Sequence, residues 1–97
     1  MIRAVWNGAV IAEAERTRRV EGNHYFPPDS LRRGYLTDSP TRTVCPWKGV
    51  AHYYRLTVDG HVNPDAAWYY PHPLPLARLL GLKRHVAFWN GVRIDQY

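Results

Sequence analysis

The stretch Val50-Ala51-His52-Tyr53-Tyr54-Arg55-Leu56-Thr57-Val58, followed by Asp59-Gly60, decides the fold class. Its side chains follow a period of two, as in a β-strand, so that one face would carry Val50, His52, Tyr54, Leu56 and Val58. Asp59-Gly60 tolerates the positive φ angles of a two-residue hairpin turn, and His61-Val62 begins the returning strand. Asn63-Pro64 should interrupt that strand, because proline donates no hydrogen bond and restricts the residue before it.

Other turn signals divide the rest of the chain into short segments. Asn7-Gly8 lies between β-prone residues 2–6 and 9–12, and Asn90-Gly91 lies between β-prone residues 85–89 and 92–95, so we predict two more hairpins. Residues 28–33 and 75–80 each begin with proline and are followed by glycine, which predicts one helical turn in each. The 97 residues should therefore form a single domain over residues 1–97. Its predicted class is all-β, mainly antiparallel, with one or two short helical turns.

Composition bounds the function classes. Hydrophobic residues make up 45% of the chain and charged residues 22%, as in globular domains, and no apolar run reaches the ~18 residues of a membrane span. The Asn7-Gly8 turn comes too early for a signal peptide, so we expect a cytoplasmic protein with no membrane partner. The one cysteine, Cys45, excludes an intrachain disulfide, and the five histidines form no i, i+2 or i, i+4 pair. We predict no metal site and no cofactor.

The net charge of +5 raises the question of a nucleic-acid partner. Eleven of the 13 basic residues are arginines, however, and they are dispersed along the chain. The densest stretch, Arg16-Thr17-Arg18-Arg19, is followed by Glu21. A basic strand face in solvent is the simpler interpretation, and an anion or nucleic-acid interface is the alternative.

The turn Cys45-Pro46-Trp47-Lys48-Gly49 carries the candidate reactive groups. Lys48 is either a surface lysine, an anion-binding group or a nucleophilic amine. Cys45 is either a small buried hydrophobe or a thiolate activated by Lys48 or His52. No nucleophile motif surrounds these residues, so Cys45, Lys48 and His52 are weak catalytic candidates only.

Aromatic residues beside prolines give the stronger indication. Some of them must fill the small core, but neighbours such as Tyr69 and Tyr70 cannot both face inward in one strand. The others would line a groove, and together with a lysine they suit a planar or anionic small ligand. The predicted ligand-binding residues are Tyr25, Trp47, Lys48, Tyr53, Trp68 and Tyr70.

The same blocks carry a resemblance to a known family. The motifs Tyr25-Phe26-Pro27-Pro28-Asp29, Cys45-Pro46 with Lys48-Gly49, and Ala67-Trp68 with Tyr70 resemble domain-of-unknown-function family 427. The resemblance implies a small bacterial cytosolic protein with a β-tent-like fold, in which two antiparallel sheets surround a ligand-sized concavity. It also implies a nucleotidyltransferase-like label, although the carboxylates here form no D-x-D pair for magnesium. The cysteine-pair zinc sites of some β-tent proteins do not transfer to a chain with one cysteine.

Three hypotheses follow for the function. In the first, the chain binds a small molecule, with Trp47, Trp68 and Tyr70 as walls and Lys48, Tyr25 and Tyr53 as polar contacts. In the second it is an enzyme, with Cys45 or Lys48 as the reactive group and His52 or Tyr53 as proton carrier. In the third it is a nucleic-acid or protein interaction module. Exposed edge strands would in addition allow a homodimer.

Overall fold

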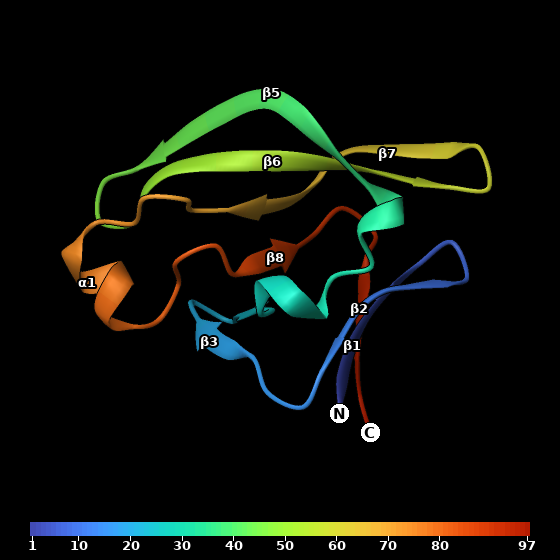
Figure 1. Ribbon diagram of the computed structural model, residues 1–97, viewed down its shortest axis with the longest axis horizontal. Helices are drawn as coiled ribbons and strands as arrows, with labels where there is room; N and C mark the ends of the chain where they lie inside the picture. Colours follow the sequence, from blue (N-terminus) through green and yellow to red (C-terminus); the bar gives the residue numbers. More distant parts are fainter.

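Antiparallel strands dominate the computed structural model, which describes residues 1–97 (Figure 1). The strands are β1 (Ile2–Trp6), β2 (Ala9–Ala14), β3 (Arg18–Val20), β4 (Asn23–Tyr25), β5 (Leu36–Cys45), β6 (Gly49–Val58), β7 (His61–Tyr69), β8 (Val86–Phe88) and β9 (Arg93–Gln96). The helical pieces are the 3-10 turns η1 (Pro28–Ser30) and η2 (Arg33–Tyr35) and the helix α1 (Pro75–Leu79). The predicted all-β class with short helical turns is confirmed.

The strands form two larger sheets and a ribbon. The larger sheets have the orders β5-β6-β7-β8 and β2-β1-β9, and β3 pairs with β4 alone. Two hydrogen bonds between Phe26 and Val86, with N–O distances of 2.7 and 2.9 Å, attach the end of the ribbon to β8. The β3–β4 ribbon is thus an addition to the two sheets that the resemblance implies.

Two of the three predicted hairpins are confirmed. Asp59-Gly60 joins β6 to β7, and Asn7-Gly8 joins β1 to β2, with the asparagine and aspartate at φ of 50°. The hairpin predicted at Asn90-Gly91 is wrong. That dipeptide has the turn conformation, but β8 pairs with β7 while β9 pairs with β1 (Figure 1). Dihedral preference is local, whereas the partner of each flank is decided by the sheet that it reaches.

The expected interruption at Asn63-Pro64 takes the form of a bulge. β7 continues through Pro64, but its register against β6 jumps from Tyr54–Ala67 to Leu56–Asn63. Asp65 lies within the jump at φ 54°, so the extra residues leave the ladder without ending the strand. Asn63, which is buried, donates to the Asn90 carbonyl at 2.8 Å and accepts from the Asn90 side chain at 3.0 Å.

Of the two predicted helical turns, the second is confirmed and the first is divided. α1 ends before Gly81, which has φ 82°. In residues 28–33, Leu31 is extended and bridges to Ala12, and this splits the segment into η1 and part of η2. The only α-helix spans five residues, and no helix could cross a membrane.

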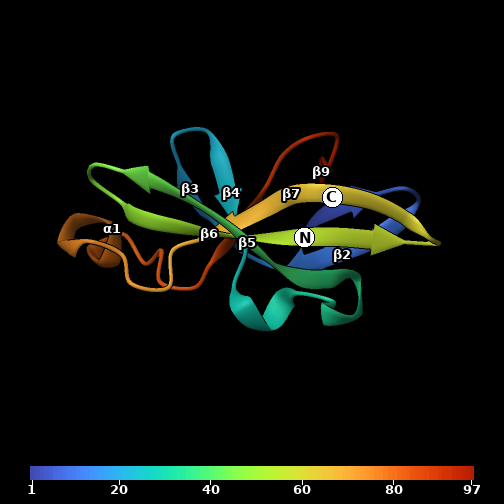
Figure 2. The same ribbon diagram turned by 90° about the horizontal axis from the view of Figure 1, so that it is seen from above.

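Each face of the four-stranded sheet covers a separate core. On one face Leu56, Phe88 and Phe26 pack with the β2-β1-β9 sheet. On the other face Tyr25, Tyr70 and Leu82 pack between the sheet, the ribbon and α1. Seen from above, the β3–β4 ribbon and the η1–η2 segment lie on opposite sides of the long strands (Figure 2). The candidate site belongs to the second, smaller core.

Candidate functional site

The turn between β5 and β6 places Lys48 inside the protein. Gly49 has φ 116°, and a Cβ there would lie 3.3 Å from the His72 carbonyl oxygen. The Leu74 amide donates to the Lys48 carbonyl at 3.0 Å, so the segment before α1 lies directly across the turn. Glycine is needed here because both the backbone conformation and the close contact exclude most side chains.

The Lys48 side chain is buried and paired. The residue is 7% exposed, and its ammonium donates to Glu21, in the turn between β3 and β4. Its Nζ also lies 5.4 Å from the ring centroid of Trp47 and 5.7 Å from that of Tyr70. Burial alone would lower the pKa of Lys48, but the hydrogen bond that it donates to Glu21, together with the nearby Tyr25 and Tyr70, raises this pKa above its ordinary value. Lys48 is therefore a fixed cation at neutral pH.

Strand register brings the aromatic side chains together beside this cation. Tyr53 of β6 is directly opposite Trp68 of β7, and Tyr70 follows two residues later on the same face. They form an open hollow of about 250 Å³, lined by Lys48, Tyr53, Trp68, Tyr70 and Trp89. Lys48 and Tyr70 are buried and Trp89 is exposed, so the hollow leads from solvent to the cation.

Several hydroxyl and indole groups around the hollow are held in position by hydrogen bonds. Trp68 donates through Nε1 to the Tyr25 hydroxyl at 3.3 Å, and the two rings meet edge to face. The Tyr53 hydroxyl is 2.9 Å from Thr43 Oγ1. Burial raises the pKa of Tyr70 to about 12, although the neighbouring Lys48 ammonium opposes this. Tyr70 thus remains a neutral phenol that can donate a hydrogen bond.

Four of the six residues predicted to bind a ligand line this hollow, namely Lys48, Tyr53, Trp68 and Tyr70. Trp47 packs beside Lys48 and against the second core, outside the lining. Tyr25 is fully buried behind Trp68.

Sequence reasoning missed two residues of the site. In the sequence Trp89 is only a flank of the Asn90-Gly91 turn, and its exposure is known from the structure alone. In the sequence Glu21 is only a negative charge that comes shortly after the basic stretch. Its pairing with Lys48 spans 27 residues and leaves no local signal, beyond the turn-forming Gly22 that follows it.

The three catalytic candidates do not converge. His52 alternates with Tyr53 along β6 and lies on the opposite face, where its ring packs 5.6 Å from that of Tyr69. Burial, together with the nearby Arg42, lowers the pKa of His52. Cys45 packs at the edge of the second core. Lys48 is protonated and so has no free electron pair for nucleophilic attack.

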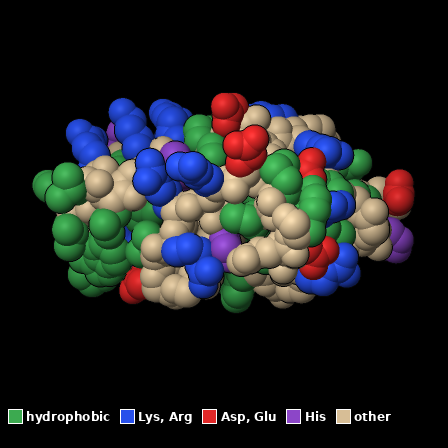
Figure 3. Space-filling view, turned by 90° about the horizontal axis from the view of Figure 1, so that it is seen from below, with side chains coloured by type: hydrophobic (Ala, Val, Ile, Leu, Met, Phe, Trp, Pro, Cys, Tyr) green, Lys and Arg blue, Asp and Glu red, His purple; other side chains and the backbone are tan.

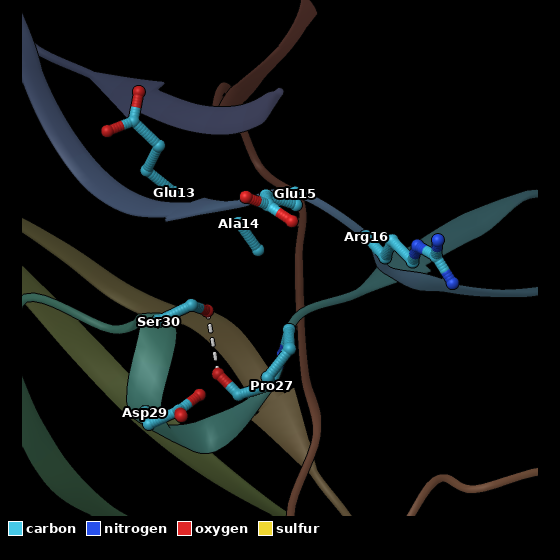
Figure 4. Close-up of a pocket in the computed structure, with 7 residues that line it drawn as sticks. All are labelled: Glu13, Ala14, Glu15, Arg16, Pro27, Asp29 and Ser30. Atoms are coloured by element: carbon cyan, nitrogen blue, oxygen red, sulfur yellow. Dashed lines mark hydrogen bonds between the residues drawn. The ribbon is translucent and has the colours of Figure 1, made fainter.

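The structure contains two further cavities, and charged side chains make up most of the lining of the larger one. A cavity of about 430 Å³ lies between β2 and η1, lined by Glu13, Ala14, Glu15, Arg16, Pro27, Asp29 and Ser30 (Figure 4). It is larger than the aromatic hollow but has one hydrophobic lining residue, so it offers little apolar surface to a ligand. No group of three or more His, Cys, Asp or Glu side chains is arranged to hold a metal ion.

The fold and the hollow define a small all-β protein with two larger antiparallel sheets, a two-stranded ribbon and an aromatic concavity that ends at a buried, paired lysine. The chain belongs to the family described as a domain of unknown function (DUF427), which matches residues 1–97. No curated protein matches the sequence.

Proposed function

We propose that the chain binds a small planar molecule with an acidic group in the hollow formed by Lys48, Tyr53, Trp68, Tyr70 and Trp89. The observation that carries the proposal is the Lys48 ammonium, which is buried and charged at the inner end of an aromatic hollow. A cation in such surroundings interacts more strongly with an anion than it would in water.

The chemistry of the lining defines the ligand. Indole and phenol rings favour a flat, apolar body, which stacks on their faces or packs against their edges. The ammonium has three donors and Glu21 accepts one of them, so a ligand carboxylate can bind beside Glu21 or replace it. The neutral Tyr70 phenol supplies a further donor. A hollow of about 250 Å³ is small among ligand pockets, which suits a ligand of one or two rings.

The experiment is a titration of aromatic carboxylates, each paired with its uncharged amide, followed by tryptophan fluorescence and calorimetry. The chain contains only two lysines, Lys48 and Lys83, and Lys83 is exposed and outside the hollow. Lys48→Met and Lys83→Met therefore remove the same charge at different places. We expect Lys48→Met to weaken carboxylate binding about tenfold or more, the value of a charged hydrogen bond, and Lys83→Met to leave it unchanged.

A second variant separates loss of binding from loss of folding. Glu21→Gln removes the competing carboxylate from an exposed turn, so it should tighten binding of the carboxylates but not of the amides. Equal affinities for carboxylate and amide, or equal effects of the two lysine variants, would refute the role of Lys48. Absence of any binding from the whole series would remove the proposal.

A further inference from the structure

A second polar cavity lies where the basic stretch of the sequence meets the segment after α1. Its volume is about 220 Å³, and it is lined by Arg16, Thr17, Arg18, Pro27 and His85. Arg16 and Thr17 connect β2 to β3, Arg18 begins β3, and His85 immediately precedes β8. The cavity shares no lining residue with the aromatic hollow.

The arginines of this cavity have no carboxylate partner. The ion pairs of the molecule are Arg3–Glu13, Arg32–Glu13, Lys48–Glu21 and Arg93–Asp95, and none includes Arg16 or Arg18. The face seen from below carries basic side chains on both halves, and several of them lie near the hydrophobic side chains at its left end (Figure 3). Arg16 and Arg18 are exposed and unpaired, so their positive charge is available to an external anion.

Contacts within the protein position three of the lining side chains, Thr17, Arg18 and His85. A Cβ on Gly81 would lie 2.9 Å from Nε and 3.3 Å from Cζ of Arg18, so the guanidinium lies against the backbone of Gly81. Thr17 Oγ1 is 2.6 Å from His24 Nδ1, and His85 Nδ1 is 3.1 Å from the Lys83 carbonyl oxygen. Side chains that are already positioned lose less conformational entropy when a ligand binds.

We propose that this cavity binds a phosphate-type oxyanion. The guanidinium group presents its N–H donors in a planar fork that matches two phosphate oxygens, and two such groups line the cavity. His85 makes its contact through Nδ1, which leaves Nε2 without a partner in the chain. The cavity has no hydrophobic lining residue, so its ligand must be recognised by charge and hydrogen bonds.

The neighbouring carboxylates limit the ligand to a compact anion. Arg16 and Pro27 also border the cavity that contains Glu13, Glu15 and Asp29. Figure 4 shows the Arg16 side chain directed away from these carboxylates. A long polyanion such as a nucleic acid would have to pass these negative charges, whereas inorganic phosphate or the terminal phosphate of a small molecule would not.

The test is titration of the folded chain with inorganic phosphate at low ionic strength, followed by amide chemical shifts and by calorimetry. Arg18→Gln and Arg16→Gln each remove one guanidinium from the cavity. Arg55→Gln is the matched control, because Arg55 is exposed on β6, has no ion pair and lies outside the cavity. We expect one saturable site, an affinity about tenfold or more lower in Arg18→Gln and Arg16→Gln, and no change in Arg55→Gln.

The phosphate affinities of two further variants distinguish this site from binding elsewhere on the protein. Tyr53→Phe alters the aromatic hollow but keeps the Glu21–Lys48 ion pair, so it should leave phosphate binding unchanged, and the oxyanion site and the hollow can fail independently. Gly81→Ala should weaken phosphate binding by displacing Arg18, with circular dichroism as the check on folding. Equal losses in Arg18→Gln and Arg55→Gln, no saturable binding, or tighter binding of a single-stranded oligonucleotide than of phosphate would each overturn the proposal.

Discussion

Tyr25→Phe tests whether Tyr25 contacts the ligand or supports the wall of the hollow. Tyr25 is fully buried, and its hydroxyl accepts the Trp68 Nε1 hydrogen bond at 3.3 Å. Phenylalanine keeps the ring and its edge-to-face contact with Trp68, whose centroid is 6.2 Å away. The substitution therefore removes one hydrogen bond and almost no packing.

The structure fixes the expected size of the effect. Loss of the hydrogen bond should lower the free energy of unfolding by about 1 kcal/mol, because the indole of Trp68 is only half-buried and can be hydrated from the hollow. For a domain of this size the melting temperature would fall by about 4–8 °C. Tyr25→Ala, by contrast, also removes the ring and leaves a cavity, so it should cost about 3–5 kcal/mol.

The assay is urea denaturation of both variants, combined with a titration of the aromatic carboxylates that we propose as ligands of the hollow. We expect Tyr25→Phe to lose a small part of the stability lost in Tyr25→Ala, and to bind ligand with an affinity near that of the wild type. Two results would contradict this. Equal destabilisation by the two variants would mean that the hydroxyl, and not the packing of the ring, provides the stability. Unchanged stability with lost binding would mean that Tyr25 contacts the ligand directly.

Three other outcomes follow from the same region. Burial raises the pKa of Tyr70 to about 12, so Tyr70 loses its proton at lower pH in the unfolded chain than in the folded protein. The free energy of unfolding should therefore fall as the pH rises from about 10 to 12. In Tyr70→Phe, urea denaturation should show a smaller fall over the same range. Because the hydrogen bond from Lys48 lowers the pKa of Glu21, the stabilisation by Glu21 is present above its ordinary pKa and lost as the pH falls through the lowered one; the acid denaturation curve of Glu21→Gln should lack that component. Gly49→Ala should lower the free energy of unfolding by about 1–2 kcal/mol, measured in urea, whereas Gly34→Ala, at a position with an ordinary φ and open space, should have no such cost.

Local patterns in the sequence predicted the elements, and distant contacts decided the rest. The alternation in residues 50–58 and the turn Asp59-Gly60 specify one hairpin between neighbours in the chain, and this hairpin is present. Asn90-Gly91 has equally strong turn chemistry, but β9 completes the sheet of β1, more than 80 residues earlier. Nothing within the turn encodes that pairing.

The candidate site divides in the same way. Tyr53, Trp68 and Tyr70 share a face because of strand period and register, which the sequence contains in part. Lys48 is buried and pairs with Glu21 across 27 residues, and the sequence contains no local signal for that contact. A lysine in a proline–glycine turn is therefore ambiguous until its partner is known.

The β3–β4 ribbon links both proposed sites, and its own structure explains why. A two-stranded hairpin with three residues in each strand is marginally stable by itself, so tertiary contacts must fix its position. Those contacts include the Phe26–Val86 hydrogen bonds, the packing of Tyr25 against Trp68, the Glu21–Lys48 ion pair and the packing of Arg18 on Gly81.

Two of these attachments use a charged side chain, Lys48 or Arg18, that we also propose as part of a binding site. A carboxylate that replaces Glu21 on Lys48 would release one attachment, whereas an oxyanion on Arg18 would leave the packing on Gly81 in place. The two ligands should therefore differ in their effect on the ribbon, with the first loosening it and the second holding it. Substitutions that remove charge but keep side-chain size are for this reason more informative than truncations, because a truncation would move the ribbon and disturb both sites together.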